Sequence, residues 1–443
     1  MKRYVITTAQ AEVRPHKQFL EGLLNYCTIN DAELMILPTF GKEAKERELH
    51  PFFKDFTIIE DEFHFNNSIK AQRRRIRPQM IDPATGLTHA VRKGKSVIFE
   101  SPQIRVKTVA TTKTLPKFLL TTGAVTLPNY ANSDDCAAER QRLGMIARDN
   151  HTYGAIVLDI KNSNSYQFRH LRANSAGVFV DKEHKYFPDK VEDAVWEALI
   201  YADWHNGKGV PKHYEASKQM ANVLKAKNGV FHDFFDGHSI NHHMQNYLIS
   251  QQLREGVDIG HHDLETELKE CGEELQRLSG LHENIYLVPS NHHDFLTRWL
   301  DEGRFVKDKQ NARLGFQLAK KYADGKDPVE EGVKLVRKKI PKNVKFMRYG
   351  ENLQIKGFEC GQHTHKGKNG SRGSLKSLEE VFGKCIGGHV HTPEEYHLMT
   401  TVGTHLPRDI FYAKGSPSGW MCRNTGITDI GTTQSFNVID GEW

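Results

Sequence analysis

The sequence predicts an α/β protein, with an N-terminal α/β domain at residues 1–190 and a second domain at residues 195–443. Two observations lead to this expectation. Apolar β-type runs alternate with segments of helical apolar spacing from the first residues onward. After about residue 190, short apolar runs each end in a cluster of Asp, Asn or His. Ligands bind at such strand ends in α/β structures, so we expect the second domain to carry the functional site.

The N-terminal domain begins with an expected strand, helix and strand. Residues 3–8 (RYVITT) are apolar and β-branched, residues 16–27 have helical apolar spacing, and residues 32–39 (AELMILPT) have the pattern of a buried strand. Similar runs at SVIFES, FLLTTGAVTLP, YGAIVLDI and YQFRHLRA predict a mixed sheet. The TTGAVT segment fits a buried strand that ends in a turn rather than a phosphate-binding loop. We find no internal repeat in the sequence.

The second domain alternates short strands with helices. Strands are expected at EALIYADWH, GVFHDFFDGH and NIYLVPSNHHDF, and helices at DLETELKECGEELQRLSG and RLGFQLAKKYADG. Residues 344–374 predict strands that lead into a glycine-rich loop. The segment KCIGGHVH follows, and strands near GWMCRN and SFNVIDGEW close the chain.

Composition restricts the class of protein. A mean hydropathy of -0.59 and 38% apolar residues are typical of a globular protein, and no apolar run approaches the roughly 20 residues of a membrane span. The N-terminus shows no secretory signal. Six cysteines without a CxxC pair favour a reducing cytoplasm over a disulfide framework or a thiolate zinc site. Composition does not distinguish a monomer from an oligomer.

Positive charge is concentrated in one segment. The net charge is +6, which is compatible with a polyanionic partner. Residues 70–117 contain twelve Lys or Arg against two carboxylates, and they include the run Arg73, Arg74, Arg75 and Arg77. Such a run is either a solvated face or a surface that neutralises phosphates.

Five polar clusters follow β-type runs in the second domain. A single histidine is more often a surface or hydrogen-bonded core residue than a ligand, but five clusters in this order indicate one shared site. In chain order they are Asp203 with His205, His232 to Asp236, Ser290 to Asp294, His363 with His365, and Gly387 to His391.

The residue types in these clusters suit a pair of metal ions. Two cations that lie about 3.5 to 4 Å apart need a shared anionic ligand, which a carboxylate provides and an imidazole does not. Two such cations leave room for a phosphate and acidify a bridging water to hydroxide for attack on phosphorus. Nitrogen and oxygen ligands without thiolate suit Mn, Fe, Mg or Zn. The double glycine of GGHVH is expected to let the backbone turn tightly beside the ions.

Residues 195–443 resemble the calcineurin-like metallophosphoesterase superfamily. The resemblance depends on the motifs ADWH, HDFFD, SNHHD, GQHTH and GGHVH. The resemblance implies a four-layer αββα sandwich with a two-metal site. The implied metal ligands are Asp203, His205 and His391 for one ion, Asn291, His363 and His389 for the other, and Asp233 as the bridge. It also implies that His292 is the catalytic histidine near the leaving group and that Asp294 orients a histidine.

Some positions depart from the family pattern. His232 and Ser290 stand where the family has glycine, which affects loop conformation beside two implied ligands. His232, His238 and His293 are either accessory ligands or residues behind the ligands. Lys368 and Arg372, in the loop KNGSRGS, either contact a substrate phosphate or are solvated.

The whole chain is similar to phage-encoded members of this superfamily that resemble early DNA-degrading proteins of large tailed phages, and more distantly to the double-strand-break repair nuclease. This resemblance implies a DNase of the host cytoplasm with little sequence preference, with Mn²⁺ as its preferred metal. The basic segment would then neutralise backbone phosphates. Two alternatives stay open. One is a phosphatase or phosphodiesterase for nucleotides or phosphoproteins, and the other is a non-catalytic host-takeover binding protein on the same fold.

Overall fold

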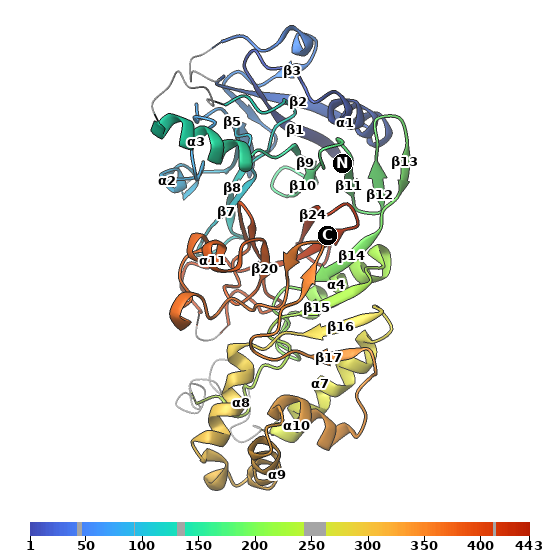
Figure 1. Ribbon diagram of the computed structural model, residues 1–443, viewed down its shortest axis with the longest axis vertical. Helices are drawn as coiled ribbons and strands as arrows, with labels where there is room; N and C mark the ends of the chain where they lie inside the picture. Colours follow the sequence, from blue (N-terminus) through green and yellow to red (C-terminus); the bar gives the residue numbers. More distant parts are fainter. Residues whose placement is uncertain (42–46, 93, 131–137, 243–262, 411–412) are drawn as a thin grey trace.

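The computed structural model describes residues 1–443 except 42–46, 93, 131–137, 243–262 and 411–412. It confirms a mixed α/β protein, and its described strands form four sheets. The first half of the chain occupies one end of the molecule, and helices of the second half occupy the other end (Figure 1). None of the described helices is long and apolar enough to cross a membrane.

The N-terminal half begins with the predicted strand, helix and strand: β1 (Lys2–Gln10), α1 (Lys17–Asn30) and β2 (Ala32–Thr39). The sheet order is β10-β9-β1-β2-β3, with β3 at Thr57–Ile58, β9 at Gly154–Ile160 and β10 at Tyr166–Arg172. β1 is parallel to β2 and antiparallel to β9, so the sheet is mixed as predicted. Because successive side chains of β1 point to opposite faces of the sheet, Val5 packs in a core with α1 and Ile6 packs in a second core on the other face.

A ten-stranded sheet joins strands from both predicted domains. Its order is β18-β19-β20-β22-β21-β7-β8-β6-β5-β4. The N-terminal members are β4 (Glu62–His64), β5 (Ile69–Gln72), β6 (Ser96–Phe99), β7 (Arg105–Val109) and β8 (Lys117–Thr121). The C-terminal members are β18 (Gln354–Ile355), β19 (Phe358–Glu359), β20 (Cys385–Gly387), β21 (Glu394–Tyr396) and β22 (Met399–Thr401). Because β7 pairs with β21, hydrogen bonds cross the predicted boundary between the domains.

The second half contains a six-stranded sheet of order β17-β16-β15-β14-β23-β24. Its strands are β14 (Trp196–Ile200), β15 (Asn228–Phe231), β16 (Asn284–Leu287), β17 (Val344–Phe346), β23 (Cys422–Thr428) and β24 (Thr433–Val438). One face packs with helices α4 (Pro211–Leu224), α7 (Leu264–Leu278) and α10 (Pro328–Arg337) around a large apolar core. The other face meets the ten-stranded sheet, where Ile200, Val230 and Ile386 share a core.

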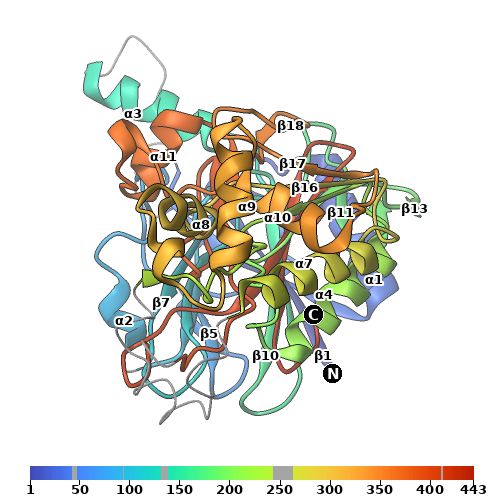
Figure 2. The ribbon, with the colours of Figure 1, turned by 90° about the horizontal axis from the view of Figure 1, so that it is seen from below.

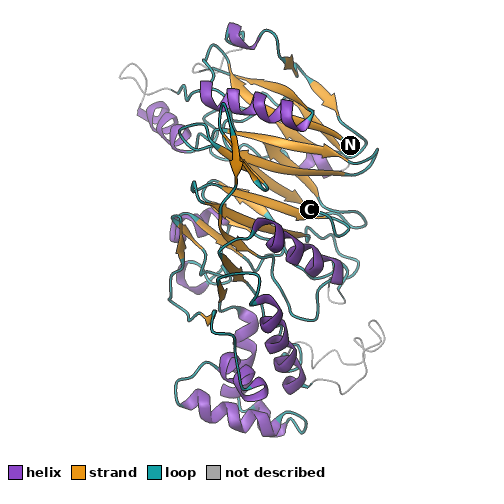
Figure 3. Cartoon of the chain, turned by 90° about the vertical axis from the view of Figure 1, so that its right-hand side faces the viewer, coloured by secondary structure: helices purple, strands orange, loops and turns teal. Residues whose placement is uncertain are grey.

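The remaining helices cover the outside of these layers. α11 (Leu375–Phe382) packs through Leu378 on the outer face of β20 and β22. α8 (Asn291–Asp301) and α9 (Ala312–Ala323) extend the helical end, which lies in front when the molecule is seen from below (Figure 2). Short helices α2 (Thr88–Arg92) and α3 (Ala138–Asp149) lie in the first half. One group of helices lies at the lower end with the sheets stacked above it, and further helices lie beside the upper sheets (Figure 3).

A three-stranded antiparallel sheet connects the halves along the chain: β11 (Phe179–Asp181), β12 (His184–Tyr186) and β13 (Val191–Asp193). The strands β14, β15 and β16 that follow are parallel. Their carboxyl ends therefore meet at one edge of the sheet, which is where Asp203, Asp233 and Asn291 lie.

Candidate metal centre

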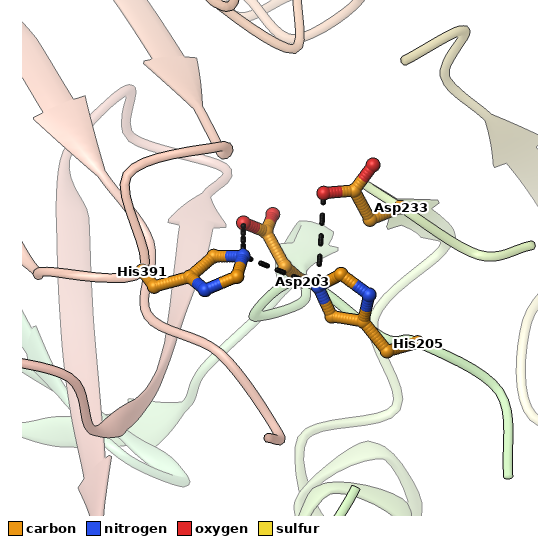
Figure 4. Close-up of side chains that lie close together, drawn as sticks. All are labelled: Asp203, His205, Asp233 and His391. Carbon is orange, nitrogen blue, oxygen red and sulfur yellow. Dashed lines mark hydrogen bonds and ion pairs between the residues drawn. The ribbon is translucent and has the colours of Figure 1, made fainter. Parts of the chain in front are cut away.

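Four of the predicted ligands converge from three separate strand ends. Asp203 and His205 follow β14, Asp233 follows β15, and His391 follows β20. Each offers a ligand atom within 4.8 Å of the others, and all four side chains are buried (Figure 4). His205 Nε2 lies 3.1 Å from His391 Nε2, and His391 Nε2 lies 3.3 Å from Asp203 Oδ2. This is the set that the sequence assigned to one ion and the bridge.

A second set of predicted ligands adjoins the first through Asp233. Asp233 Oδ2 lies 3.1 Å from His363 Nε2 and 3.7 Å from His205 Nε2, so it faces both sets. Asn291 Oδ1 lies 3.2 Å from His363 Nε2 and 3.0 Å from His389 Nδ1. All seven residues predicted as ligands are thus in one place, with Asp233 between the two groups.

The spacing and the unsatisfied atoms of these groups fit divalent cations. Ligands about 2.0–2.2 Å from one metal ion are about 2.9 to 3.5 Å from each other; the distances given above lie in this range except the 3.7 Å between Asp233 Oδ2 and His205 Nε2. Asp203 Oδ1 and both carboxylate oxygens of Asp233 are buried and accept no well-aligned hydrogen bond. A buried carboxylate oxygen without a partner is costly. Side chains that face a common third atom, rather than one another, show this pattern.

The imidazoles are in the form that binds metal. Asp236 Oδ1 lies 2.8 Å from His205 Nδ1, which assigns the proton to Nδ1 and leaves the Nε2 lone pair facing the cluster. Burial lowers the pKa of His363 and of His391 well below the usual value, so both are neutral. Neutral imidazole is the ligand form of histidine.

The carboxylates favour a cation in the same place. Burial raises the pKa of Asp203, and the negative charge of Asp233 raises it further. Two ionised carboxylates in a buried site repel each other unless a positive charge lies between them. A divalent cation provides this charge, so the donor set is one that binds metal.

The loops that carry the ligands have strained backbones. His205, Asp233, His389 and His391 have φ angles of 47°, 45°, 75° and 59°, in the left-handed region that non-glycine residues rarely adopt. Each such residue costs on the order of 1 kcal/mol or more and persists only where surrounding structure enforces it. In each of these loops, the left-handed residue turns the backbone after the strand, so that its own side chain faces the cluster.

The double glycine of GGHVH has a purpose other than the predicted turn. A Cβ atom on Gly388 would lie 2.1 Å from Asp203 Oδ1, and one on Gly387 would lie 2.2 Å from Thr364 Cγ2. Neither glycine has a positive φ, whereas the histidines that follow do. The glycines are therefore needed for space beside the ligands, and the turn itself is made by histidine.

The predicted catalytic pair is divided in the structure. His292 lies in the first turn of α8, where its Nδ1 is 2.5 Å from the carbonyl oxygen of Asp236 and its ring is 4.7 Å from that of His205. Asp294 contacts the Tyr349 hydroxyl at 2.9 Å and Lys366 Nζ at 2.9 Å, and its Oδ2 lies 3.9 Å from His365 Nε2. The carboxylate that touches both His205 and the region of His292 is Asp236, to which the sequence reasoning gave no role.

The accessory histidines lie beside the predicted ligands, and His238 forms a further group with Asp236 and Glu267 that could hold a metal ion. The ring of His232 is buried, with its centroid 5.5 Å from that of His363, and His293 is buried on α8. His238 Nδ1 lies 3.2 Å from Glu267 Oε1 and 3.5 Å from Asp236 Oδ2. The sequence indicated the histidines of this outer group, and the second aspartate of HDFFD was its signal for Asp236.

The basic residues lie in two loops. Arg73, Arg74, Arg75 and Arg77 follow β5 in the first half, and Lys368 and Arg372 follow β19, in the same loop as His363. Arg75, Arg77, Lys368 and Arg372 are exposed. Their contact with nucleic acid stays a prediction.

The fold and the cluster define a mixed α/β protein with a buried carboxylate and histidine site compatible with two metal ions. No known protein-family model matches the chain. The chain is 26% identical over 448 residues to Protein A1 of Escherichia phage T5, covering 94% of this chain and 78% of that protein. This similarity supports a phage origin. Vps29 of Chaetomium thermophilum aligns with 43% of this chain and 96% of its own, with 9% identity and a TM-score of 0.23, too low to support an argument.

Proposed function

We propose that the protein is a phosphodiester hydrolase that depends on two divalent metal ions and that its substrate is DNA. The observation that supports this most is the convergence of two ligand sets on Asp233, whose oxygens accept no well-aligned hydrogen bond. The proposal is also supported by the packing around the site, where helices cover one face of the six-stranded sheet and the ten-stranded sheet covers the other. The imidazole, amide and carboxylate donors suit Mn, Fe, Mg or Zn, and we propose Mn²⁺ among them because the resemblance to phage DNA-degrading proteins implies it.

The side chains around the proposed ions have two tasks: they orient the ligands, and they transfer protons. Two bound cations would supply positive charge for a phosphate and activate water. Asp236 fixes the tautomer of His205, so that Nε2 faces the cluster. The Nδ1–H of His292 donates to the Asp236 carbonyl, which leaves His292 Nε2 to exchange a proton with a leaving oxygen.

DNA is favoured over a small ester by two observations. A relative that aligns with 94% of this chain comes from a phage, and the chain carries a net charge of +6 with twelve Lys or Arg between 70 and 117. A basic segment increases affinity for any phosphate backbone without reading sequence. We therefore propose cleavage with little sequence preference.

The test is cleavage of linear and circular double-stranded DNA with Mn²⁺, with Mg²⁺ or with EDTA. The proposal predicts cleavage that requires metal and that is lost in Asp233→Ala. The circular substrate separates internal cleavage from cleavage at ends. Hydrolysis of an aryl phosphodiester without DNA cleavage would instead support a small-molecule or protein phosphoesterase. A metal-loaded protein inert toward both substrates would support a binding protein on the same fold.

A further inference from the structure

The strand connections of the first half are repeated in the second half. β1, β2 and β3 are parallel, and β9 and β10 continue the sheet antiparallel to β1. Likewise β14, β15 and β16 are parallel, and β23 and β24 continue antiparallel to β14. The two ends of the ten-stranded sheet correspond in the same way, β4-β5-β6-β8-β7 to β18-β19-β20-β22-β21. The expectation of no internal repeat is wrong at the level of topology.

The order of elements along the chain agrees with this correspondence. α1 follows β1 as α4 follows β14, and α2 lies between β5 and β6 as α11 lies between β19 and β20. The two copies meet through corresponding strands, since β7 pairs with β21 and β10 contacts β24. Contact of like with like is the arrangement of a two-fold symmetric dimer. The chain therefore contains two copies of one fold.

Hydrogen bonds align the copies residue by residue. The Thr8 N–H donates to the Gly123 carbonyl at 3.2 Å, and the Asp203 N–H donates to the Gly403 carbonyl at 2.9 Å. Each also forms a parallel bridge with the residue after that glycine. Thr8 therefore occupies the position of the metal ligand Asp203.

The loop after β6 can be aligned with the loop after β20, because one contacts Thr8 as the other contacts Asp203. The Ser101 N–H donates to Thr8 Oγ1 at 3.2 Å, as the His389 N–H donates to Asp203 Oδ2 at 2.8 Å. This alignment replaces metal ligands by neutral side chains: Thr8 for Asp203, Gln10 for His205, Ser101 for His389 and Gln103 for His391. The strand end that corresponds to Asp233 reads Leu-Pro-Thr-Phe, residues 37–40, without a carboxylate. Among its described residues, the N-terminal copy has no comparable ligand set for a divalent cation.

An arginine takes the place of a further ligand. Glu359 of β19 pairs with Cys385, four residues before His389. Lys70 of β5 pairs with Val97, four residues before Ser101. Because His389 and Ser101 are aligned, Glu359 and Lys70 hold the same position in the two copies. Four residues further along stand His363 and Arg74. Arg74 Nε is a buried atom without a hydrogen-bond partner.

The carboxylate of Glu100, beside Arg74, is already hydrogen-bonded to the backbone. Glu100 accepts hydrogen bonds from the backbone N–H groups of Arg74 and Ile76, both at 2.8 Å. In the C-terminal copy, bound cations would present positive charge to a phosphate, and the carboxylates of Asp203 and Asp233 would offset part of that charge. In the N-terminal copy the guanidinium presents positive charge itself, and both corresponding carboxylates are absent.

We propose that the N-terminal copy is a metal-free site that binds the phosphate backbone of duplex DNA without cleaving it. This inference rests on the proposed function, because it supplies a second contact for the same substrate. Guanidinium groups bind phosphate in a planar, bidentate geometry, so they replace a cation for binding. Arg77, three residues after Arg74, is exposed and adds a second guanidinium to the same loop.

The two sites are close enough for one duplex. The two sites are at most about 30 Å apart. This limit is the length of the backbone path that runs from Gln103 to Val106, crosses to its strand partner Glu395, and continues to His391. The segment that follows the arginines also contacts the hairpin beyond the GGHVH loop, where His397 Nε2 lies 2.7 Å from the Ile81 carbonyl oxygen. A duplex of about 20 base pairs is longer than this separation.

The experiment measures binding of a fluorescent 20-base-pair duplex in EDTA, by anisotropy, at several salt concentrations. The wild type is compared with Arg74→Ala/Arg77→Ala. Arg313→Ala/Lys320→Ala is the matched control, because it removes two exposed charges from α9 at the opposite end of the molecule. Arg77→Ala alone serves if the double variant unfolds.

The proposal predicts binding without metal that is on the order of tenfold weaker in the double variant, with a salt slope smaller by about 2. Arg77→Ala alone should reduce the slope by about 1. Wild-type protein that does not bind in EDTA, or equal losses in the variant and the control, would overturn it. Hydrolysis of an aryl phosphodiester with Mn²⁺ tests the proposed function separately and should be equal in all of these proteins.

Discussion

At the residue scale, the candidate site depends on the difference between a ligand and a residue that supports one. Asp233 presents the same oxygen, Oδ2, to His205 and His363. Asp236 lies three residues further along and contacts His205 on Nδ1, the nitrogen that faces away from the cluster. Removal of the first eliminates a donor common to both sets, whereas removal of the second only frees an imidazole to rotate.

Asp233→Ala should therefore reduce bound metal from two ions per chain toward none. Asp236→Ala should retain the metal with about 10- to 100-fold weaker affinity. Elemental analysis after dialysis at several metal concentrations measures both. His292→Ala is the control that should keep its metal and lose turnover, because His292 belongs to neither predicted ligand set. Equal loss in the two aspartate variants would remove Asp233 as the bridge.

At the scale of the element, the β20 strand and its loop place two histidines beside a carboxylate from another sheet. The close approach of Gly388 to Asp203 leaves no room for a side chain, since a Cβ atom would also lie 2.9 Å from His232 Cβ and 3.0 Å from His363 Nδ1. Contacts below 3.0 Å to buried, packed atoms force the backbone or the ligands to move.

Gly388→Ala should displace the loop and lower metal affinity at least tenfold, with a smaller effect on stability in EDTA. Gly280→Ala is the matched control, because a Cβ atom there meets nothing within 4 Å. Titration with Mn²⁺, followed by calorimetry, measures the affinity of both proteins. Unchanged affinity in Gly388→Ala would show that the loop has room that the structure does not indicate.

At the scale of the whole molecule, a buried ionic group joins the two copies of the fold. Glu395 of β21 bonds Arg172 of β10 and Arg423 of β23, so both copies contribute to it. His170 lies beside this group, and its Nε2 is 2.7 Å from the Thr121 carbonyl oxygen. Burial lowers the pKa of His170 to about 4, so it is neutral in the folded protein.

This pKa predicts acid sensitivity. Between about pH 6.5 and 4, unfolded His170 binds a proton that the folded protein excludes, so folding stability falls as the pH falls. From pH 8 to 5 this residue should remove about 2 kcal/mol, and His170→Gln should lose that part of the pH dependence. Urea unfolding in EDTA at both pH values measures it. His184→Gln, at an exposed position, should retain the wild-type dependence, and equal behaviour of both variants would contradict the assignment.

Much of the site was predictable because metal binding restricts residue types. Aspartate, asparagine and histidine after β-type runs are visible in one dimension, and parallel strands bring such ends together. The same reasoning did not identify Asp236, because its role is a contact with His205 from a different loop. It assigned Asp294 to a histidine without identifying which one; the carboxylate lies 3.9 Å from His365 Nε2 and also contacts Tyr349 and Lys366. Those contacts depend on loop conformation, which local sequence patterns do not specify.

The sequence by itself determined the α/β class, the first strand, helix and strand, and the set of candidate ligands. Hydrophobic periodicity and ligand chemistry are local properties of the chain, so both can be read without coordinates. Only the tertiary structure decided that β7 pairs with β21, that Thr8 stands where Asp203 does, and that two copies of one fold face each other. Backbone topology persists when side chains change, because many apolar sequences fill the same core. The repeat is therefore preserved in hydrogen bonds after it has disappeared from the sequence.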